Sequence, residues 1–255
     1  MSNKREREKR REARLQEETK VDAGERRTRL LQFGAGAVFL AIAAVVVLIV
    51  VNSSSSDDVD PSNLKDAGSV DSLVKGIPQQ GLVLGDPKAK VELIEFGDLQ
   101  CPVCKAYSEE ILPPIIEGQV KKGQVKLAFR NFVIIGAQSQ TAGAAALAAG
   151  GQGRGWNYLE LFYRNQGKEN SGYADDEFLT AVAKGAGVKD IAEWEKDRKG
   201  KAFTSEVTET TAEAQKLGFT GTPSFAIKGP SSNGVELLGT PESVEEIEER
   251  IEKAS

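Results

Sequence analysis

Both cysteines of this 255-residue chain lie in the segment Phe96-Gly97-Asp98-Leu99-Gln100-Cys101-Pro102-Val103-Cys104-Lys105. The segment follows residues 91–96, which are mostly apolar at both odd and even positions, the pattern of a central strand covered from both sides. A helix is predicted to open at Cys101-Pro102, because proline at the first helical position loses no hydrogen bond. The i, i+3 spacing then puts both sulfurs on one face of the helix, within reach of a disulfide.

Cys101 is predicted to lie at the N-terminus of this helix. Unpaired backbone N–H groups and the positive end of the helix dipole favour a thiolate there. A thiolate is the form that attacks a disulfide, so Cys101 is expected to be reactive at neutral pH. Cys104, one turn further on, can then attack the mixed disulfide and release the partner. The pair is therefore predicted to be a redox-active disulfide that needs no further cofactor.

Three other uses of the cysteine pair stay open. A structural disulfide over so short a loop would remove little chain entropy and would be a poor staple. A zinc site would need further ligands, and the chain has no histidine, which also excludes Ser-His-Asp and Cys-His catalytic pairs. A Cu(I) carrier could use two thiolates, although it would have no histidine and no methionine beyond Met1. We favour redox exchange and expect no metal site.

Charge is distributed unevenly along the chain, whose net charge is −5. Residues 1–29 hold 11 Lys or Arg against 7 Asp or Glu, whereas the chain after Val51 holds 22 against 31. An acidic main body argues against nucleic acid as the principal partner. The apolar fraction of 40% is high enough to support a folded core.

Residues 30–51 are predicted to form a transmembrane helix. Residues 33–51 carry no charge and would span roughly 28 Å as a helix, close to the thickness of the hydrocarbon core. A cleaved signal peptide is the alternative, but the apolar run is longer than usual and no A-x-A-like cleavage site follows it. Arginines before the span and aspartates after it predict that residues 1–29 are a charged cytoplasmic tail. The main body is then expected outside the cytoplasm, where disulfide chemistry is permitted, with the lipid bilayer holding the anchor.

A flexible linker is predicted over residues 52–75, since serine and aspartate dominate its start. Residues 76–255 have the size of a single domain. Their apolar patterns predict a strand, a helix and a strand, then a helical block, then two strands and a helix. Thr240 is expected to cap that last helix, which would start at Pro241.

A second motif, Gly221-Thr222-Pro223-Ser224-Phe225, opens the first of the two late strands. Together with the cysteine segment, it resembles the active site of membrane-anchored or secreted DsbA-like thiol-disulfide oxidoreductases. The resemblance covers about residues 81–254 and implies an α/β thioredoxin-like fold. The 118 residues between Cys104 and Pro223 exceed what a bare thioredoxin needs. This surplus matches the helical domain that DsbA-like proteins insert, here at about residues 138–218.

The resemblance also implies roles for individual residues. Cys101 would be the nucleophile and Cys104 the resolving cysteine. Pro223 would follow a cis peptide bond, which is almost confined to X-Pro, and would turn the backbone of Thr222 toward the sulfurs. That backbone could bind an extended client segment as an added strand. The alternative is an ordinary trans proline that starts a strand.

Glu95 is the third candidate catalytic residue. Counting by two along the predicted strand puts it on the same face as Val91 and Leu93, so it is a candidate for burial. The resemblance implies an acid beneath the disulfide that accepts the proton of the resolving cysteine. A buried carboxylate has a raised pKa, which suits such a role. The alternative is a glutamate at the end of the strand that reaches water.

The active-site loop Pro102-Val103 departs from the family in one respect. The strongest oxidants of the family carry histidine where this chain has Val103. An imidazole can stabilise the thiolate and so favour the reduced enzyme, which makes a better oxidant. Valine cannot do this, so we expect a less oxidising protein.

The sequence therefore predicts a membrane-anchored, extracytoplasmic thiol-disulfide oxidoreductase. Its expected partners are exported proteins with thiols or disulfides, and a membrane redox protein that regenerates it. A reductase or isomerase in the same compartment is one alternative. A thioredoxin-fold carrier that binds Cu(I) without turnover is the other.

Overall fold

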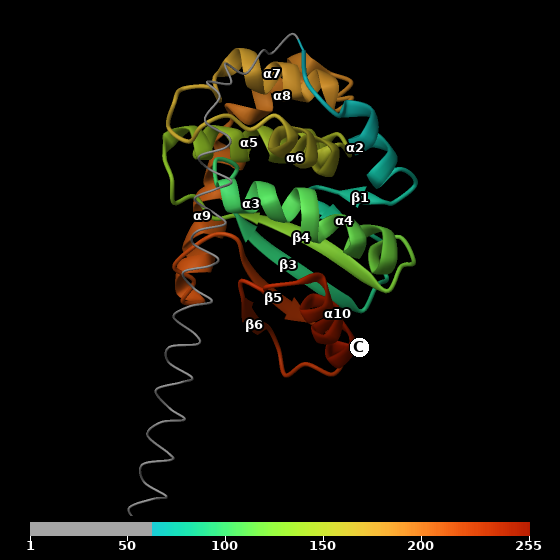
Figure 1. Cartoon of the computed structure of the whole chain (residues 1–255). Coiled ribbons are helices and arrows are strands. Elements are labelled where there is room, and N and C mark those ends of the chain that lie inside the picture. The colour runs from blue at the N-terminus through green and yellow to red at the C-terminus, as the bar shows by residue number, and fades with distance from the viewer. Residues whose placement is uncertain (1–62) are drawn as a thin grey trace, which may run out of the picture. The chain divides into compact units, whose positions relative to one another are not determined.

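A six-stranded mixed sheet organises residues 63–255, the part of the chain that the computed structural model describes (Figure 1). In their order across the sheet, the strands are β1 (Gln79–Gln80), β2 (Val83–Leu84), β4 (Val125–Asn131), β3 (Val91–Gly97), β5 (Ser224–Lys228) and β6 (Glu236–Gly239). The central strands β3 and β4 are parallel, and every other neighbouring pair is antiparallel. The predicted strands around residues 91–96 and 125–132 are thus the centre of the sheet.

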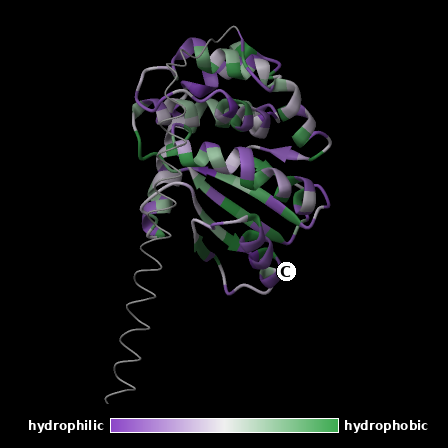
Figure 2. Ribbon diagram, viewed as in Figure 1, coloured by the Kyte–Doolittle hydropathy of each residue, from purple (hydrophilic) through white to green (hydrophobic). Residues whose placement is uncertain are grey.

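The two faces of β3 bury different side chains. Val91 and Leu93 belong to the main core, and Glu95 follows them by alternation, whereas Ile94 and Phe96 belong to a smaller cluster on the opposite face. Figure 2 shows the central strands as mainly hydrophobic. Burial on both faces explains why the sequence of this strand is apolar at odd and even positions.

Helices cover both faces of the sheet. In chain order they are α2 (Ala67–Val74), α3 (Pro102–Ala106), the π-helical segment η1 (Tyr107–Ile111), α4 (Leu112–Ile115), the π-helical segment η2 (Ile116–Val120), α5 (Ala137–Gly151), α6 (Gly155–Arg164), α7 (Asp176–Gly185), α8 (Ile191–Arg198), α9 (Lys201–Lys216) and α10 (Val244–Ala254). Residues of α3, α4 and α10 join the main core, while Ala214 of α9 packs in the smaller cluster with Phe96. This order of elements confirms the predicted α/β arrangement.

One continuous helical stretch runs from α3 to η2, although Pro113 and Pro114 lie inside it. Neither proline has an N–H group to donate to the preceding turn. The turn before them widens into a π-helix, in which the Leu112 N–H donates to the Tyr107 carbonyl. The interruption or kink expected at the prolines is therefore a local widening, and the helical stretch continues to Val120.

Helices α5 to α9 lie between β4 and β5, so a helical domain is inserted into a thioredoxin-like fold (Figure 1). Helix α5 is buried along most of its length, and most of its buried residues are alanine or glycine. The other inserted helices pack around it, and the indole N–H of Trp194 donates to the Ala145 carbonyl at 2.9 Å. The inserted domain has its own dense packing, continuous with the main core.

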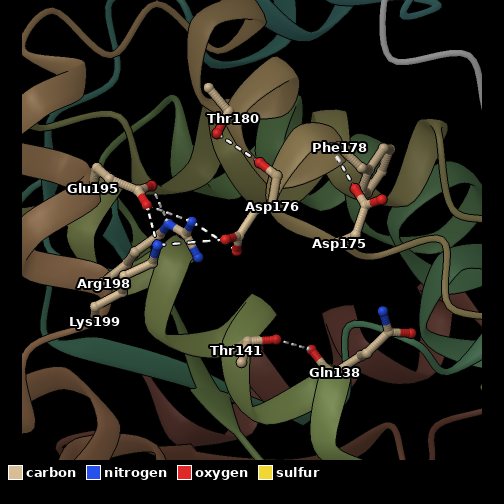
Figure 3. A network of polar contacts seen from close by, with 9 residues as sticks. All are labelled: Gln138, Thr141, Asp175, Asp176, Phe178, Thr180, Glu195, Arg198 and Lys199. Carbon is tan, nitrogen blue, oxygen red and sulfur yellow. Dashed lines mark hydrogen bonds and ion pairs between the residues drawn. The ribbon is translucent and has the colours of Figure 1, made fainter.

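A buried arginine links two of the inserted helices (Figure 3). The side chain of Arg198, at the end of α8, is 3% exposed, and its guanidinium lies 5.0 Å from the centre of the Trp194 ring. It donates to Asp176 of α7 at 2.8 Å and to both carboxylate oxygens of Glu195. These charge-assisted hydrogen bonds satisfy a cation that would otherwise be costly to bury.

The linker predicted over residues 52–75 is too long. Residues 67–74 form α2, and its Val70 and Val74 are buried in the main core. So short a helix offers too few apolar positions for a clear helical period, so its sequence is hard to distinguish from a linker.

The predicted cap of the last helix is also wrong. Helix α10 starts after Ser243, whose hydroxyl accepts a hydrogen bond from the Glu246 N–H at 3.3 Å. Thr240 instead donates its hydroxyl to the Pro223 carbonyl at 2.7 Å. Both residues are good capping types, and the sequence alone did not reveal that Thr240 is used by the turn before β5.

The predicted cytoplasmic tail (1–29) and membrane helix (30–51) lie outside the described residues, as does the start of the linker. Within residues 63–255, no helix is both long enough and apolar enough to cross a membrane.

Two glycines at the α5–α6 junction let the backbone of Gly81 come close. A Cβ atom on Gly155 would lie 2.4 Å from the Gly81 carbonyl oxygen, and one on Gly150 would lie 2.8 Å from it. Because backbone cannot easily move away, we expect Gly155→Ala to lower the free energy of unfolding by about 2 kcal/mol, measured by urea denaturation.

Gly151→Ala is the matched control. Its Cβ would meet only the Phe203 ring, at the ordinary contact distance of 3.9 Å. Alanine is also the better helix former, so stability should stay the same or rise by up to about 1 kcal/mol. Equal destabilisation by both substitutions would contradict the close-approach argument.

Candidate active site

Sheet topology brings the two sequence motifs together. β3 and β5 are antiparallel neighbours with Phe96 opposite Ser224, so the C-terminal end of β3 lies beside the N-terminal start of β5. Helix α3 begins a few residues after β3, and the Thr222–Pro223 peptide bond immediately before β5 is cis. The cis bond that the family resemblance implied is therefore present, and it lies beside the start of α3.

Cys101 is the N-cap residue of α3. Its sulfur accepts a hydrogen bond from the Cys104 N–H at 3.4 Å and lies 3.4 Å from the Thr222 carbonyl oxygen, to which the thiol donates. The Cys104 thiol contributes most to lowering the pKa of Cys101 to about 7, and the backbone N–H groups of Cys104 and Val103 add to this effect. These donors outweigh burial, which acts in the opposite direction.

Cys104 lies one turn inside the helix and is fully buried. Burial, followed by the adjacent Cys101, raises the pKa of the Cys104 thiol well above its usual range. Both cysteines are free thiols in this structure. The arrangement therefore favours a thiolate on Cys101 and a protonated thiol on Cys104.

Glu95 is buried, with 1% of its surface exposed, and its Oε1 has no hydrogen-bond partner among the described residues. Burial raises the pKa of this carboxyl to about 8, with further contributions from the negative charges of Glu160 and Cys101. Of the two positions considered for Glu95, the buried one is confirmed. A carboxyl that ionises near pH 8 can hold or release a proton in the neutral range.

Asp98 and Gln100 fix the loop that leads into α3. The Asp98 carboxylate accepts from the Gln100 N–H at 2.8 Å, and its other oxygen accepts from the N–H groups of Ile134 and Ile135. The Gln100 side chain is fully buried and donates to the Ser139 hydroxyl at 2.9 Å. The loops after β3 and β4 are thus tied together through one carboxylate.

The inserted helical domain also holds this loop. The Gln166 amide donates to the carbonyls of Leu99 and Cys101, at 2.7 and 3.1 Å. The Tyr163 hydroxyl donates to the Asp98 carbonyl at 3.3 Å. These contacts orient the backbone just before the first turn of α3.

All the residues that the sequence predicted for the site come from this one region, with Pro102 exposed and Val103 half-buried between the cysteines. Sequence reasoning missed the residues that support them, namely Asp98, Gln100, Ser108, Glu160, Tyr163 and Gln166. Only Asp98 had a local signal, since an aspartate two residues before a backbone N–H in a turn is typical of an Asx-turn. Within residues 63–255, no group of three or more Cys, Asp or Glu side chains is arranged to hold a metal ion.

Comparison with known proteins gives matches over most of the described chain. The thioredoxin family model matches residues 78–253. The probable disulfide bond formation protein D of Bacillus cereus is 33% identical over 153 residues, which are 59% of this chain and 71% of that protein. Disulfide bond formation protein D of Bacillus subtilis is 29% identical over 191 residues, 74% of this chain and 81% of that protein.

Solved structures give the same result. Oxidised BdbD from Bacillus subtilis superimposes with a TM-score of 0.61 at 25% identity, covering 70% of this chain and 97% of that one. A thioredoxin-like oxidoreductase from Silicibacter pomeroyi superimposes with a TM-score of 0.55 at 29% identity, covering 72% and 96%. This chain therefore belongs to the thioredoxin family and, within it, to the DsbA-like disulfide bond formation proteins, which are thiol-disulfide oxidoreductases.

Proposed function

We propose that this oxidoreductase is anchored in the cell membrane by residues 30–51 and oxidises the thiols of exported proteins through Cys101-Pro102-Val103-Cys104. The observation that carries the proposal is the contrast between the two sulfurs. The Cys101 sulfur accepts a hydrogen bond from the Cys104 N–H at the start of α3 and has a lowered pKa, whereas burial strongly raises the pKa of the Cys104 thiol. One sulfur is thus suited to meet the client, and the other to resolve the mixed disulfide.

The reaction starts from the Cys101–Cys104 disulfide. A client thiolate attacks the Cys101 sulfur, the disulfide breaks, and Cys104 leaves with the electron pair and takes up a proton. A second client thiolate then attacks the client sulfur of the mixed disulfide and releases Cys101 as a thiolate. The client loses two electrons and gains a disulfide, while the enzyme becomes a dithiol that a membrane redox partner reoxidises.

Two neighbours of the cysteines would assist these steps. Protonated Glu95 would supply the proton that Cys104 takes up and would recover it when the enzyme is reoxidised. The backbone of Thr222, which precedes β5 and already contacts the Cys101 sulfur, would bind an extended client segment as an added strand.

Oxidative refolding of a reduced, unfolded secreted protein tests the proposal. The full-length oxidised protein should catalyse disulfide formation in the client. With oxidised glutathione as the oxidant, which first forms a disulfide with Cys101, Cys104→Ser should accumulate a mixed disulfide with the client and release reduced glutathione, whereas Cys101→Ser should form none. In cells, thiol alkylation should find the pair mostly oxidised and in the membrane fraction.

Other outcomes would replace the proposal. A pair that is mostly reduced in cells would identify a reductase or an isomerase. Stoichiometric Cu(I) binding without any turnover of a client would identify a carrier. A protein found in the soluble fraction would contradict the anchor.

The Cys101 thiol is predicted to ionise near neutral pH. In the reduced protein, absorbance at 240 nm should show one thiolate forming with a midpoint near pH 7, because Cys104 donates to the Cys101 sulfur. Cys101→Ser should abolish this step. A first thiolate that forms only near the ordinary cysteine value of pH 9 would contradict the prediction.

Glu95→Gln is predicted to slow disulfide exchange and to stabilise the fold at alkaline pH. General acid-base catalysis contributes about 100-fold or more, so the steps that protonate or deprotonate Cys104 should slow by at least about tenfold. Burial raises the pKa of Glu95 from 4.5 to about 8 in the folded protein. The protonated Glu95 carboxyl therefore contributes its full share of the free energy of unfolding below pH 4.5, and this contribution is lost as the pH rises toward 8.

The substitution removes this loss, so its gain in stability should be near zero at pH 4 and on the order of 4 kcal/mol at pH 8. Urea denaturation at the two pH values measures the difference. A gain that is the same at both would mean that Glu95 does not keep its proton in the folded protein.

Val103→His is predicted to make the protein more oxidising. An imidazole beside Cys101 would stabilise the thiolate and so the reduced form. We expect the equilibrium with a glutathione redox buffer to shift by about tenfold, which corresponds to roughly 30 mV for a two-electron couple. Val103→Leu, which adds no charge, should leave the potential near that of the natural protein.

A further inference from the structure

A second buried carboxyl lies below the active site. Glu160, on α6, is 1% exposed, and its Oε2 accepts a hydrogen bond from the Ser108 hydroxyl at 3.0 Å. Arg164, one turn later on the same helix, places a guanidinium nitrogen 3.9 Å from that oxygen. A glutamate is rarely buried unless its charge is paired, so this side chain calls for an explanation.

The position of Glu160 relates it to the redox pair. Ser108 lies one turn after Cys104 on the helical stretch that starts at Cys101, and both residues are buried. The hydrogen bond from Ser108 therefore places Glu160 one helical turn from the resolving cysteine.

A second path of contacts leads from Glu160 to Glu95. Tyr163, three residues after Glu160 on α6, packs edge-on against Phe129, with the ring centres 6.5 Å apart. Phe129 is the residue of β4 that pairs with Glu95 of β3. The helix that carries Glu160 thus packs, through Tyr163, against the strand residue that pairs with Glu95.

We propose that Glu160 is a positioning residue of the redox site, which faces Glu95 as a second carboxyl and keeps the Glu95 proton in place for exchange with Cys104; this inference rests on the function proposed above. Glu160 does not touch the sulfurs, so it acts through Glu95. The inserted helical domain would in this way take part in the redox chemistry.

The charged groups around Glu160 support this positioning role. The charged groups that face it are Glu95 on β3, Glu109 on η1 and Arg164 on its own helix. Two carboxylates cannot both ionise easily in one apolar region, and Arg164 and the Ser108 hydroxyl favour ionisation of Glu160. Burial raises the pKa of Glu160 to about 7 despite these partners, and a negative charge on Glu160 raises the pKa of Glu95.

The experiment uses Glu160→Gln in the full-length reduced protein. Glutamine has nearly the same shape and can still accept from Ser108, but it carries no charge. Carbon-13 NMR of labelled glutamate carboxyls, assigned with Glu95→Gln, follows the titration of Glu95. We expect its midpoint to fall by about one pH unit, and the pH profile of disulfide exchange to move by the same amount.

Glu110→Gln is the matched control, because Glu110 is exposed on η1, two residues from Ser108. It should leave the titration of Glu95 and the exchange profile unchanged. If Glu160→Gln fails to fold, Ser108→Ala decides the question. It removes a donor that favours the Glu160 charge, so the midpoint of Glu95 should move in the same direction by a smaller amount.

The outcomes separate the inference from the proposed function. An unchanged Glu95 titration in folded Glu160→Gln, or in Ser108→Ala where that variant decides, overturns the inference and leaves the redox function standing. A natural protein that exchanges no disulfides at any pH overturns the proposed function, and the positioning role falls with it. A shifted titration together with a shifted exchange profile supports both.

Discussion

Antiparallel pairing of β5 with β3 is the constraint on which the active site depends. With Phe96 opposite Ser224, the C-terminal end of β3 and the N-terminal start of β5 lie side by side. The Cys101 sulfur therefore lies 3.4 Å from the Thr222 carbonyl oxygen, although 121 positions separate the two residues in the sequence. A slip of one residue would turn the buried side chains of β5 to the opposite face. The burial of Phe225, whose ring stacks on Tyr107 of η1, thus fixes the register that the redox site requires.

Burial around the cysteines raises the pKa of each acidic group there, unless hydrogen-bond donors stabilise the charged form of that group. Cys101 receives its hydrogen-bond donors from the first turn of α3, so its thiolate is stabilised although it is buried. Cys104 and Glu95 lack comparable donors, and burial raises the pKa of both. The site therefore holds a charged Cys101 sulfur beside a Cys104 thiol and a Glu95 carboxyl that both stay protonated. This separation arises from where the donors are, since the two cysteines are chemically identical.

Local signals account for what the sequence predicted correctly. Proline after Cys101 marks the start of α3, and alternation along β3 places Glu95 on the core face. The cis bond before Pro223 came from the family resemblance. Contacts between distant elements were not predictable, because the packing of α6 against η1 decides that Ser108 meets Glu160. Short elements were missed for a different reason: α2 and the turn around Thr240 carry too few residues for a period to appear.

The inserted domain is more than an addition to a thioredoxin-like fold. It supplies Gln166, which binds the carbonyls of Leu99 and Cys101, and Tyr163, which binds that of Asp98. Buried carbonyls without such donors would be costly, so the conformation of the loop before α3 depends on the insertion. The N–H groups of α3 point at the Cys101 sulfur only while that loop is held. The reactivity of the Cys-Pro-Val-Cys motif is thus set partly by side chains that lie 60 or more residues away in the sequence.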